Sequence, residues 1–313
     1  MTLLVTGANG FVGTALCRLA QARGLDVRAA VRMTCDLPVP QVAVGDINAK
    51  TDWRSALVGC DTVIHLAALA HRPQGTDANA HAALHATNVD GALHLARQAA
   101  DAGISRFVFL SSIKAWGETT KPGQHAGEGD ACQPQDAYGR SKHAAEQALR
   151  GLAIERGMAL VIVRAPLVYG PEAKANFAAL VRAVCAGWPL PLGAVRNARS
   201  LVGLDNLCDF LLCCAQHPAA AGQTFHVSDG VDLSSAELVR AIARAYGKPI
   251  RLLALPPWLL RSCAGLLGQG ATAQRLLDNF QLDISKARSL LGWEPLVPLD
   301  EGLRRALARQ GTR

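Results

Sequence analysis

Tyr138 and Lys142 stand four residues apart in a stretch whose pattern predicts a helix, so their side chains share one face of it. A phenol has an ordinary pKa of about 10 and is a poor acid–base catalyst at neutral pH. A positive charge beside it favours the phenolate and brings that pKa toward the working range. The spacing therefore indicates a proton carrier and its activating cation, although an exposed polar helix face would show the same pattern.

Two serines, Ser111 and Ser112, follow directly on the apolar run 106–110, which predicts a strand. At a strand end, a hydroxyl group can form a hydrogen bond with a substrate oxygen. Serine, tyrosine and lysine in this order are more specific than a Tyr-x-x-x-Lys match alone. We therefore expect these groups to meet in one catalytic site.

The elements that must hold such a site begin with a glycine-rich turn near the N-terminus. Residues 2–6 predict a buried strand, and Gly7, Gly10 and Gly13 follow it at the opening of a helix over 11–23. Glycine at these places allows a tight turn, a backbone close to a pyrophosphate, and close packing of helix on strand. The helix N-terminus offers unpaired N–H groups to the anion. The turn predicts a dinucleotide site; the alternative is a plain strand-to-helix turn.

The end of the second predicted strand, residues 26–31, bears on the choice of dinucleotide. NAD sites usually place an acidic residue there for the ribose hydroxyls, whereas NADP sites carry arginine for the 2′-phosphate. Arg32 stands at this point, and the first carboxylate after it is Asp36. We therefore expect NAD(P), with NADP(H) slightly favoured over NAD, and we expect Asp46 and Ile47 to contact the adenine.

Short apolar runs alternate with longer helical patterns through the first half of the chain. The predicted strands are residues 2–6, 26–31, 62–66, 106–110 and 159–164, and the helices between them include 11–23, 88–102 and 141–156. Strands this short and continuously apolar, separated by helices, argue for a parallel sheet covered on both faces. We predict an α/β fold with a doubly wound parallel Rossmann sheet.

The pattern loosens after residues 164–171. A helix and a loop broken by Pro and Gly follow, one more strand is predicted at 224–227, and 234–313 is mainly helical. We predict a smaller, mostly helical C-terminal substrate lobe interleaved with the sheet domain. The expected division assigns residues 1–165 and about 201–228 to the cofactor-binding domain, and residues 166–200 and 229–313 to the lobe.

Composition excludes several classes of partner. The net charge is +7, but no basic run exceeds two residues and no aromatic residues alternate with arginine, so we expect small phosphorylated ligands and no nucleic acid. The nine cysteines show no Cys-x-x-Cys pair and stand mostly in apolar stretches, which favours buried thiols over disulfides or a metal site.

No part of the sequence predicts a targeting or membrane-spanning segment. The N-terminal residues lack the basic and then apolar regions of a signal peptide. The most apolar tract, 252–267, is broken by Pro256, Pro257 and Arg261 and is too short to span a bilayer. We expect a core or pocket-wall helix there, with shallow packing on a membrane as the alternative, and a soluble cytoplasmic protein.

Further motifs extend along the chain. They are TGANGFVG at 6–13, HLAA at 65–68, Asn88 at a helix start, SSIKAWGE at 111–118, YGRSK at 138–142, RAPLVYGP at 164–171, LDISKA at 282–287 and LGW at 291–293. With these motifs the chain closely resembles the extended short-chain dehydrogenase/reductase family over nearly its whole length. The resemblance implies a catalytic set of Ser112, Tyr138 and Lys142, because Ser112 lies five residues before Gly117.

The glycine-rich turn and the resemblance together give a set of expected ligand contacts. The cofactor contacts are Gly7, Gly10, Phe11, Val12, Gly13, Arg32, Asp46, Ile47, Leu66, Ala67, Ala68, Asn88, Ser111, Tyr138, Lys142, Ala165, Pro166 and Val168. The substrate contacts are Ser112, Asn176, Phe177, Leu192, Arg199 and Arg275. Arg199 is expected at a diphosphate, whereas Arg275 is equally compatible with a solvated surface charge.

Within the family, the chain looks most similar to nucleotide-sugar 4-epimerases and 4-ketoreductases acting on UDP-sugars. SSIKAWGE, and RAPLVYGP with KANF at 174–177, resemble the surface-polysaccharide branch that makes UDP-N-acetylquinovosamine. The resemblance implies hydride transfer at a sugar carbon while Tyr138 exchanges the hydroxyl proton. One position departs from the pattern, since typical epimerases carry Asn where this chain has Leu167.

Four functions remain to be weighed. The absent acid at the end of the second strand and the branch motifs favour a 4-ketoreductase acting on a UDP-4-keto-6-deoxy-N-acetylhexosamine. The alternative is a UDP-glucose or UDP-N-acetylglucosamine 4-epimerase with tightly bound NAD. A non-catalytic NAD(P) sensor is disfavoured by the intact Tyr138 and Lys142, and a dehydratase by Ile113 and Lys114, where an acidic pair is expected.

The resemblance also implies a homodimer that pairs through two helices, near 88–102 and 141–156. Small side chains at Ala92, Ala96, Ala99 and Ala100 would permit close helix packing between the two copies.

Overall fold

A seven-stranded sheet forms the centre of the computed structural model, which describes residues 1–70, 78–173 and 175–308, apart from the side chains of 78, 175 and 176. Its strands are β1 (Thr2–Thr6), β2 (Asp26–Val31), β3 (Gln41–Ala43), β4 (Thr62–His65), β5 (Arg106–Ser112), β7 (Ala159–Ala165) and β10 (Thr224–His226). They pair in parallel in the order β10-β7-β5-β4-β1-β2-β3. The order reverses between β1 and β4, so the predicted doubly wound α/β fold is confirmed.

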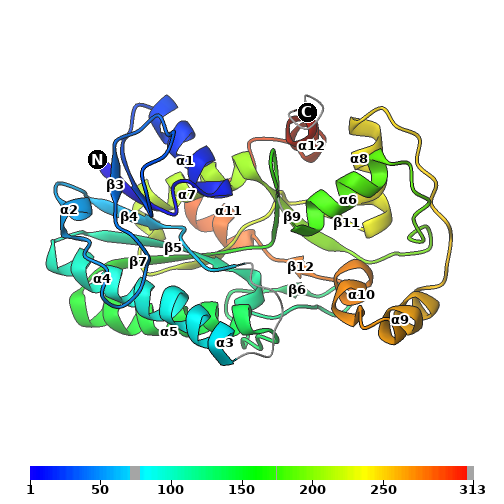
Figure 1. Ribbon diagram of the computed structural model, residues 1–313, viewed down its shortest axis with the longest axis horizontal. Coiled ribbons are helices and arrows are strands. Elements are labelled where there is room, and N and C mark those ends of the chain that lie inside the picture. Colours follow the sequence, from blue (N-terminus) through cyan, green and yellow to red (C-terminus); the bar gives the residue numbers. More distant parts are fainter. Residues whose placement is uncertain (71–77, 174, 309–313) are drawn as a thin grey trace.

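Helices cover both faces of this sheet (Figure 1). One face carries α1 (Phe11–Ala22), α7 (Leu204–Gln216) and α11 (Ser285–Leu291), and the other carries α2 (Arg54–Leu57), α4 (Ala92–Asp101) and α5 (Ala137–Arg156). Two apolar cores result, one on each side, as expected for strands such as β4 in which every residue is buried.

The alanine face of α4 belongs to one of these cores. Ala92, Ala96 and Ala99 are completely buried against the chain's own sheet, and Ala100 packs partly against the same core. The expectation that these four residues pack against a second copy is therefore wrong. Their small side chains instead bring α4 close to the strands below it.

Two helix starts differ from the sequence prediction. The helix predicted at 141–156 begins at Ala137, because the Asp136 carboxylate caps it by accepting a hydrogen bond from the Gly139 N–H at 2.6 Å. The helix predicted at 88–102 is preceded by α3 (Ala78–His85) and begins as a wide turn, η1 (Ala86–Gly91), before α4 continues it to Asp101. Such π-type turns often mark functional sites.

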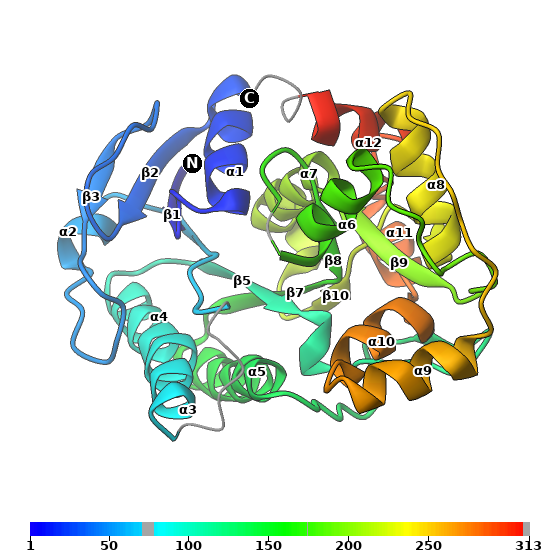
Figure 2. The same ribbon diagram turned by 45° about the vertical axis from the view of Figure 1, so that its right-hand side comes forward.

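The remaining elements form a C-terminal lobe beside the sheet (Figure 2). Its helices are α6 (Ala175–Cys185), α8 (Ser235–Ala245), α9 (Pro257–Leu266), α10 (Gly270–Leu277) and α12 (Leu299–Ala308). Its strands are β8 (Leu167–Tyr169), β9 (Arg199–Gly203) and β11 (Asp232–Leu233) in one small sheet, and β6 (His125–Ala126) with β12 (Gln281–Leu282) in another. We use "C-terminal lobe" for these elements and "sheet half" for the seven strands and the helices covering them.

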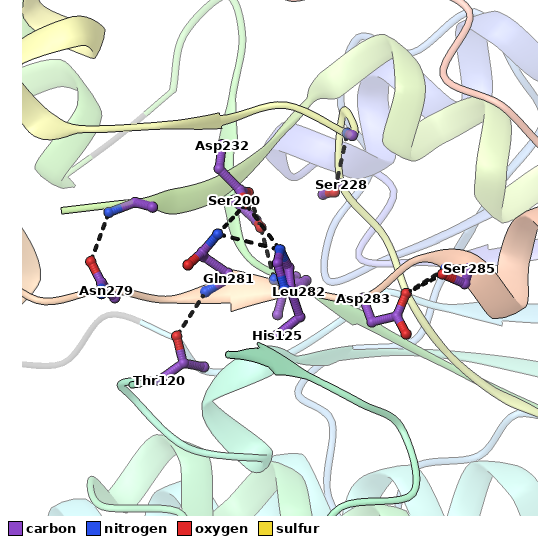
Figure 3. A network of polar contacts seen from close by, with 12 residues as sticks. Thr120, His125, Ser200, Ser228, Asp232, Asn279, Gln281, Leu282, Asp283 and Ser285 are labelled. Carbon is purple, nitrogen blue, oxygen red and sulfur yellow. Dashed lines mark hydrogen bonds and ion pairs between the residues drawn. The ribbon is translucent and has the colours of Figure 1, made fainter. Parts of the chain in front are cut away.

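One strand of the lobe comes from an early part of the chain. β6 lies between β5 and α5 in sequence, yet it pairs in parallel with β12. Figure 3 shows the polar side chains at this junction, where the Asp232 carboxylate accepts hydrogen bonds from Ser200 and from Gln281 Nε2, the latter at 2.8 Å. His125 Nε2 lies 3.5 Å from the same carboxylate. The chain between Ser112 and Tyr138 is thereby joined to β9 and β12.

The apolar tract at 252–267 forms a pocket-wall helix, one of the two placements expected for it, and not a core helix. It supplies α9, none of whose residues is buried, although Leu260 and Ala264 on its inner side line a cavity. None of the helices in the described ranges combines the length and the apolar composition needed to cross a bilayer.

Candidate active site

The glycine-rich turn places backbone against backbone at the point where the strand order reverses. Gly7 adopts φ +64°, and a Cβ on it would lie 2.8 Å from the Ala67 nitrogen, just after β4. A Cβ on Gly13 would lie 2.2 Å from the Gly7 carbonyl oxygen. Side chains at either position would separate α1 from β1 or push β1 from the segment after β4. The motif therefore fits the close approach that was predicted from its spacing.

This turn has the features of an anion site. α1 begins at Phe11 after Gly10, and it has neither a side-chain cap nor an acidic residue in its first turn. A Cβ on Gly10 would meet only the Gly7 carbonyl, at 3.1 Å, so its outer side is open. The first N–H groups of α1, including those of Phe11 and Val12, can therefore bind a pyrophosphate. The residues present fit a dinucleotide.

Two of the predicted adenosine contacts form an ion pair with each other. Arg32 Nε lies 2.8 Å from an Asp46 carboxylate oxygen, just beyond the ends of β2 and β3. Both side chains are about three-quarters exposed, at 70% and 76%. A pair this exposed is weak, so either partner can be drawn to a bound ligand. Ile47 lies next to Asp46 and packs partly against the core beneath α4.

The two serines at the end of β5 face opposite sides of the sheet. Ser111 is buried, and its hydroxyl donates a hydrogen bond to Glu146 Oε1 at 2.6 Å. Glu146 is also held by Arg164, whose Nη2 lies 2.7 Å from Oε2. Ser112 is only partly buried, and its hydroxyl accepts a 3.3 Å hydrogen bond from the Lys114 N–H. Of the two hydroxyl groups, only that of Ser112 is partly exposed, whereas that of Ser111 is buried against Glu146.

Tyr138 and Lys142 lie in the first two turns of α5. Lys142 is almost fully buried: its Nζ donates a 2.7 Å hydrogen bond to the Leu110 carbonyl oxygen and lies 4.3 Å from the centre of the Phe109 ring. Burial lowers the pKa of Lys142 to about 7, against the opposing charge of Glu146. Burial also raises the pKa of Tyr138, and the Asp136 carboxylate adds to the effect. In the ligand-free protein the phenol is thus strongly protonated.

Lys114 joins the serine strand to the tyrosine helix. It belongs to the short helix η2 (Ile113–Ala115), and its ammonium forms an ion pair with Asp136 and another, at 3.3 Å, with Glu118. A Cβ on Gly139 would lie 2.4 Å from the Lys114 carbonyl oxygen. The glycine beside Tyr138 therefore allows α5 to contact η2. Asp136 is held both by the Gly139 N–H and by the Lys114 ammonium. Lys114 thus lies in a half-buried junction between η2 and α5.

Asn88 is buried and holds the segment that follows β4. Its side-chain oxygen accepts a hydrogen bond from the Leu69 N–H at 2.8 Å, and its Nδ2 donates to the Ser141 hydroxyl at 3.0 Å. The stretch containing Leu66, Ala67 and Ala68 is thereby tied to α5. These hydrogen bonds make Asn88 a positioning residue in this structure.

Two arginines of the C-terminal lobe form a positively charged pair. Arg199 Nη1 donates to the Asp278 carbonyl at 2.9 Å, and its guanidinium lies 5.7 Å from the Phe280 ring centre. Burial lowers the pKa of Arg199 to about 10, with Asp278 and Glu118 opposing and Arg275 adding to the shift. The Nε of Arg275 is buried and has no hydrogen-bond partner among the described residues. An anion placed here would satisfy both groups.

The other predicted contacts lie on both sides of the boundary between the halves. Ala165 and Pro166 are buried at the end of β7, and Val168 lies in β8 beside Leu167, which is 40% exposed. Phe177 packs on Tyr169 with 6.0 Å between ring centres, and Leu192 is 5% exposed. The backbone of Asn176 is in α6, but its side chain lies outside the described residues. Because the side chains of Phe177 and Leu192 are buried, only their backbone atoms remain available to contact a ligand.

Sequence reasoning missed three residues that hold the site. Asp136 has a recognisable signal, because an Asp three residues before a glycine at a helix start is a cap candidate. Glu146 lies one turn beyond Lys142 and could have been found from the same helical spacing. Asp232 could not, because its partners Ser200, Gln281 and His125 are distant in the sequence.

Known proteins resemble this chain over nearly its full length. The model of the NAD dependent epimerase/dehydratase family matches residues 3–228. A UDP-glucose 4-epimerase from Vibrio cholerae is 42% identical over 306 residues, which cover 97% of this chain and 93% of that protein.

Solved structures of the same kind share the fold. UDP-N-acetylglucosamine 4-epimerase from Bacillus cereus superimposes with a TM-score of 0.82 at 21% identity, covering 99% of this chain and 100% of that one. Thermus thermophilus UDP-glucose 4-epimerase in complex with NAD gives 0.79 at 23% identity, with full coverage of both chains. Together with the glycine-rich turn, the family match and the close relative establish that the chain is an enzyme of the NAD-dependent epimerase/dehydratase family, as its resemblance to the extended short-chain dehydrogenases/reductases predicted.

Proposed function

We propose that the protein oxidises and re-reduces C4 of a UDP-linked sugar, with net 4-epimerisation as the reaction. One observation carries the proposal: Ser112 and the Tyr138 helix meet at the carboxyl edge of the sheet, where η2 touches α5. The 42% identity to a UDP-glucose 4-epimerase supports the reaction type. The catalytic roles of Ser112, Tyr138 and Lys142 are part of the same proposal.

In this mechanism, Tyr138 carries the proton. Its phenolate accepts the proton of the sugar 4-hydroxyl, and the Ser112 hydroxyl donates a hydrogen bond to the same oxygen as the carbonyl forms. The returning step reverses the transfer, and Tyr138 gives its proton back to O4. NAD, when bound, supplies the hydride acceptor and a positive charge that favours the phenolate. Lys142 adds its own charge from the same face of α5 and holds the ribose of the cofactor.

The substrate diphosphate would lie at Arg199 and Arg275. Burial and the nearby Arg275 disfavour the charge of Arg199, and Arg275 Nε lacks a partner among the described residues. A diphosphate supplies two negative groups and several acceptor oxygens, so it removes both penalties at once. Asn176, and the backbones of Phe177 and Leu192, complete the proposed substrate contacts.

A second candidate is a 4-ketoreductase that reduces a UDP-4-keto-6-deoxy-N-acetylhexosamine. Leu167 favours it, because this half-exposed residue stands where epimerases typically carry Asn. An epimerase must also let the keto-sugar turn within the site, whereas a reductase delivers hydride to one face only.

Incubation with UDP-N-acetylglucosamine or UDP-glucose, without added cofactor and followed by NMR, separates the two. Formation of the C4 epimer supports the epimerase and rules out a dedicated reductase. If no epimer forms, oxidation of NAD(P)H by a UDP-4-keto-sugar supports the reductase. Failure of both assays contradicts the proposal that C4 of a UDP-sugar is the reacting centre.

The cofactor of the family is NAD, and we propose that Arg32 additionally allows NADP(H) to bind. A 2′-phosphate would take the place of the Asp46 carboxylate on the Arg32 guanidinium. Titration of both dinucleotides tests this, with Arg32→Ala expected to weaken NADP(H) and leave NAD nearly unchanged. Equal weakening of both would contradict the role.

Three further expectations are carried as proposals. The first is the division into residues 1–165 with about 201–228, and 166–200 with 229–313. The second is a cytoplasmic location. The third is a homodimer formed by the outer faces of α4 and α5, since the alanine face of α4 is already occupied. Sedimentation velocity tests the dimer, and a monomer at micromolar concentration would contradict it.

A further inference from the structure

α9 is apolar on nearly every side, yet the rest of the protein leaves its outer face uncovered. Its inner residues Leu260 and Ala264 pack partly against the core of the C-terminal lobe and line an apolar cavity of about 160 Å³. Its outer face shows Trp258 at 68% exposure, and Leu266 and Leu267 at 90% and 75%. A helix that is apolar all round normally lies in a core or in lipid.

The exposed apolar surface extends beyond the helix. Backbone hydrogen bonds of 2.9 Å, from Leu190 N–H to the Arg251 carbonyl and from Leu253 N–H to the Leu190 carbonyl, bring a second segment alongside. We call the combined surface the apolar patch; it consists of Trp188, Leu253, Leu255, Trp258, Leu266 and Leu267. Figure 2 shows α9 at the outer edge of the molecule. Exposed apolar patches of this kind mark interaction sites.

The stretch of chain that carries most of the patch contains cations but no acidic residue. Between residues 238 and 277 the sequence contains no Asp or Glu, whereas the whole chain carries 25 acidic against 32 basic residues. The cations in that stretch are Arg240, Arg244, Lys248, Arg251, Arg261 and Arg275. Arg275 belongs to the proposed substrate site and Arg261 pairs with Asp278, but Lys248 and Arg251 are exposed beside the patch.

We propose that the apolar patch and its neighbouring cations dock the C-terminal lobe on an anionic lipid surface. Such a surface supplies an apolar interior for the leucines, an interfacial zone suited to the two tryptophans, and negative headgroups for Lys248 and Arg251. α9 has ten residues, or about 15 Å of helix, so it lies along the interface and does not cross it. A second copy of the chain fits less well, because symmetric pairing would place these cations against themselves.

Co-sedimentation of the full chain with sucrose-loaded vesicles tests the proposal. We expect binding to vesicles of phosphatidylcholine with phosphatidylglycerol, weaker binding to phosphatidylcholine alone, and release as salt is added. The combined variant Trp258→Ser/Leu266→Ser/Leu267→Ser should lower the partition coefficient by about a hundredfold, since it removes the buried apolar area. The pair Lys248→Gln/Arg251→Gln should lower it by about tenfold, and only on the anionic vesicles.

Leu296→Ser is the matched control, because Leu296 is 63% exposed but lies outside the patch. It should bind vesicles like the unmodified chain. Activity without vesicles should be equal in all variants, since none of the substituted residues belongs to the proposed active site. If circular dichroism shows that the triple variant is unfolded, the test relies on Lys248→Gln/Arg251→Gln alone.

Three results would overturn the proposal. The first is no sedimentation with anionic vesicles. The second is an equal loss of binding in Leu296→Ser. The third is a vesicle-free dimer that the triple variant converts to a monomer, which would show that a second copy covers the patch.

Discussion

The sheet half and the C-terminal lobe hold their parts of the site in different ways. At the glycine-rich turn of the sheet half, backbone touches backbone, as where Gly13 meets the Gly7 carbonyl and Gly7 meets Ala67. In the lobe, the contacts are made by side chains: the Asp232 carboxylate accepts hydrogen bonds from Ser200 and Gln281. The lobe also contains α9, a helix with no buried residue. Backbone contacts tolerate no added atom, whereas side-chain contacts can be exchanged. A rigid backbone contact suits the binding of one unchanging cofactor, whereas exchangeable side-chain contacts suit a site whose substrate differs between relatives.

The largest expected effect comes from adding one methyl group to the backbone contact. Gly13→Ala places a Cβ within 2.2 Å of the Gly7 carbonyl, so α1 must move away from β1. We expect a loss of about 1–3 kcal/mol or more in unfolding free energy, and NAD binding too weak to measure by calorimetry. Gly151→Ala is the control, because no atom lies within 4 Å of its Cβ and it should be neutral or stabilising. Normal NAD binding by Gly13→Ala would contradict the view that backbone contacts in the sheet half tolerate no added atom.

Tyr138→Phe should separate chemistry from architecture. Only the hydroxyl is lost, so folding and NAD affinity should stay close to normal while kcat falls by about 10²–10⁴-fold. Tyr246→Phe, on the far side of the C-terminal lobe, should keep full activity. A loss of only about tenfold or less in kcat would indicate an indirect role. That result would contradict the proposal that Tyr138 carries the proton.

Arg199→Ala should affect the lobe alone. Losing a charged hydrogen bond to the diphosphate should raise KM for the UDP-sugar by about tenfold to a hundredfold. NAD binding and the melting temperature should change little, since Arg199 lies outside the seven-stranded sheet. Arg196→Ala, at an exposed neighbour, should leave KM unchanged. A KM effect of equal size in both variants would point to general electrostatic attraction rather than a specific contact.

The smallest effect concerns the pH dependence of stability without cofactor. Burial gives Lys142 a pKa of about 7, whereas an unfolded lysine titrates near about 10.4. Between these values only the unfolded state binds the proton, so this residue makes stability rise with pH, and its burial cost is complete at and below about pH 7. The unfolding free energy of Lys142→Met should therefore exceed that of the unmodified protein at low pH. The difference should shrink as the pH approaches the pKa of the unfolded lysine, about pH 10.

Urea titrations across that pH range provide the measurement. Exposed Lys121→Met should give a difference that does not change with pH. A pH-independent difference for Lys142→Met would show that the buried ammonium keeps its ordinary pKa.

Much of the sheet half could be predicted from the sequence, because its signals are local. β1 and β2 begin and end where their apolar runs do, and the glycine spacing located the turn. The start of α5 was placed four residues late, since the Asp136 cap was not recognised. The wide turn at Ala86–Gly91 is not predicted by the sequence; it contains Asn88, whose hydrogen-bond partners Leu69 and Ser141 lie elsewhere in the chain.

The lobe was less predictable because its contacts are distant in the sequence. β6 and β12 have two residues each and show no apolar pattern, yet they join segments 156 residues apart. α9 was expected in a core or at a pocket wall on composition alone, and composition does not say whether a partner surface exists. Arg199 and Arg275 could be nominated from the resemblance, but the burial that shifts the pKa of Arg199 appears only in three dimensions.

The junction at Lys114 has a consequence for how such an enzyme can change. Lys114 and Asp136, 22 residues apart, close the neck of a loop that leaves the sheet half between Ser112 and Tyr138 and visits the lobe through β6. With its neck closed, the loop can be lengthened, shortened or exchanged without altering the spacing of Ser112 and Tyr138, the two proposed catalytic groups. Transplanting this loop between relatives is thus a route to new substrate preferences that leaves the proposed catalytic groups in place.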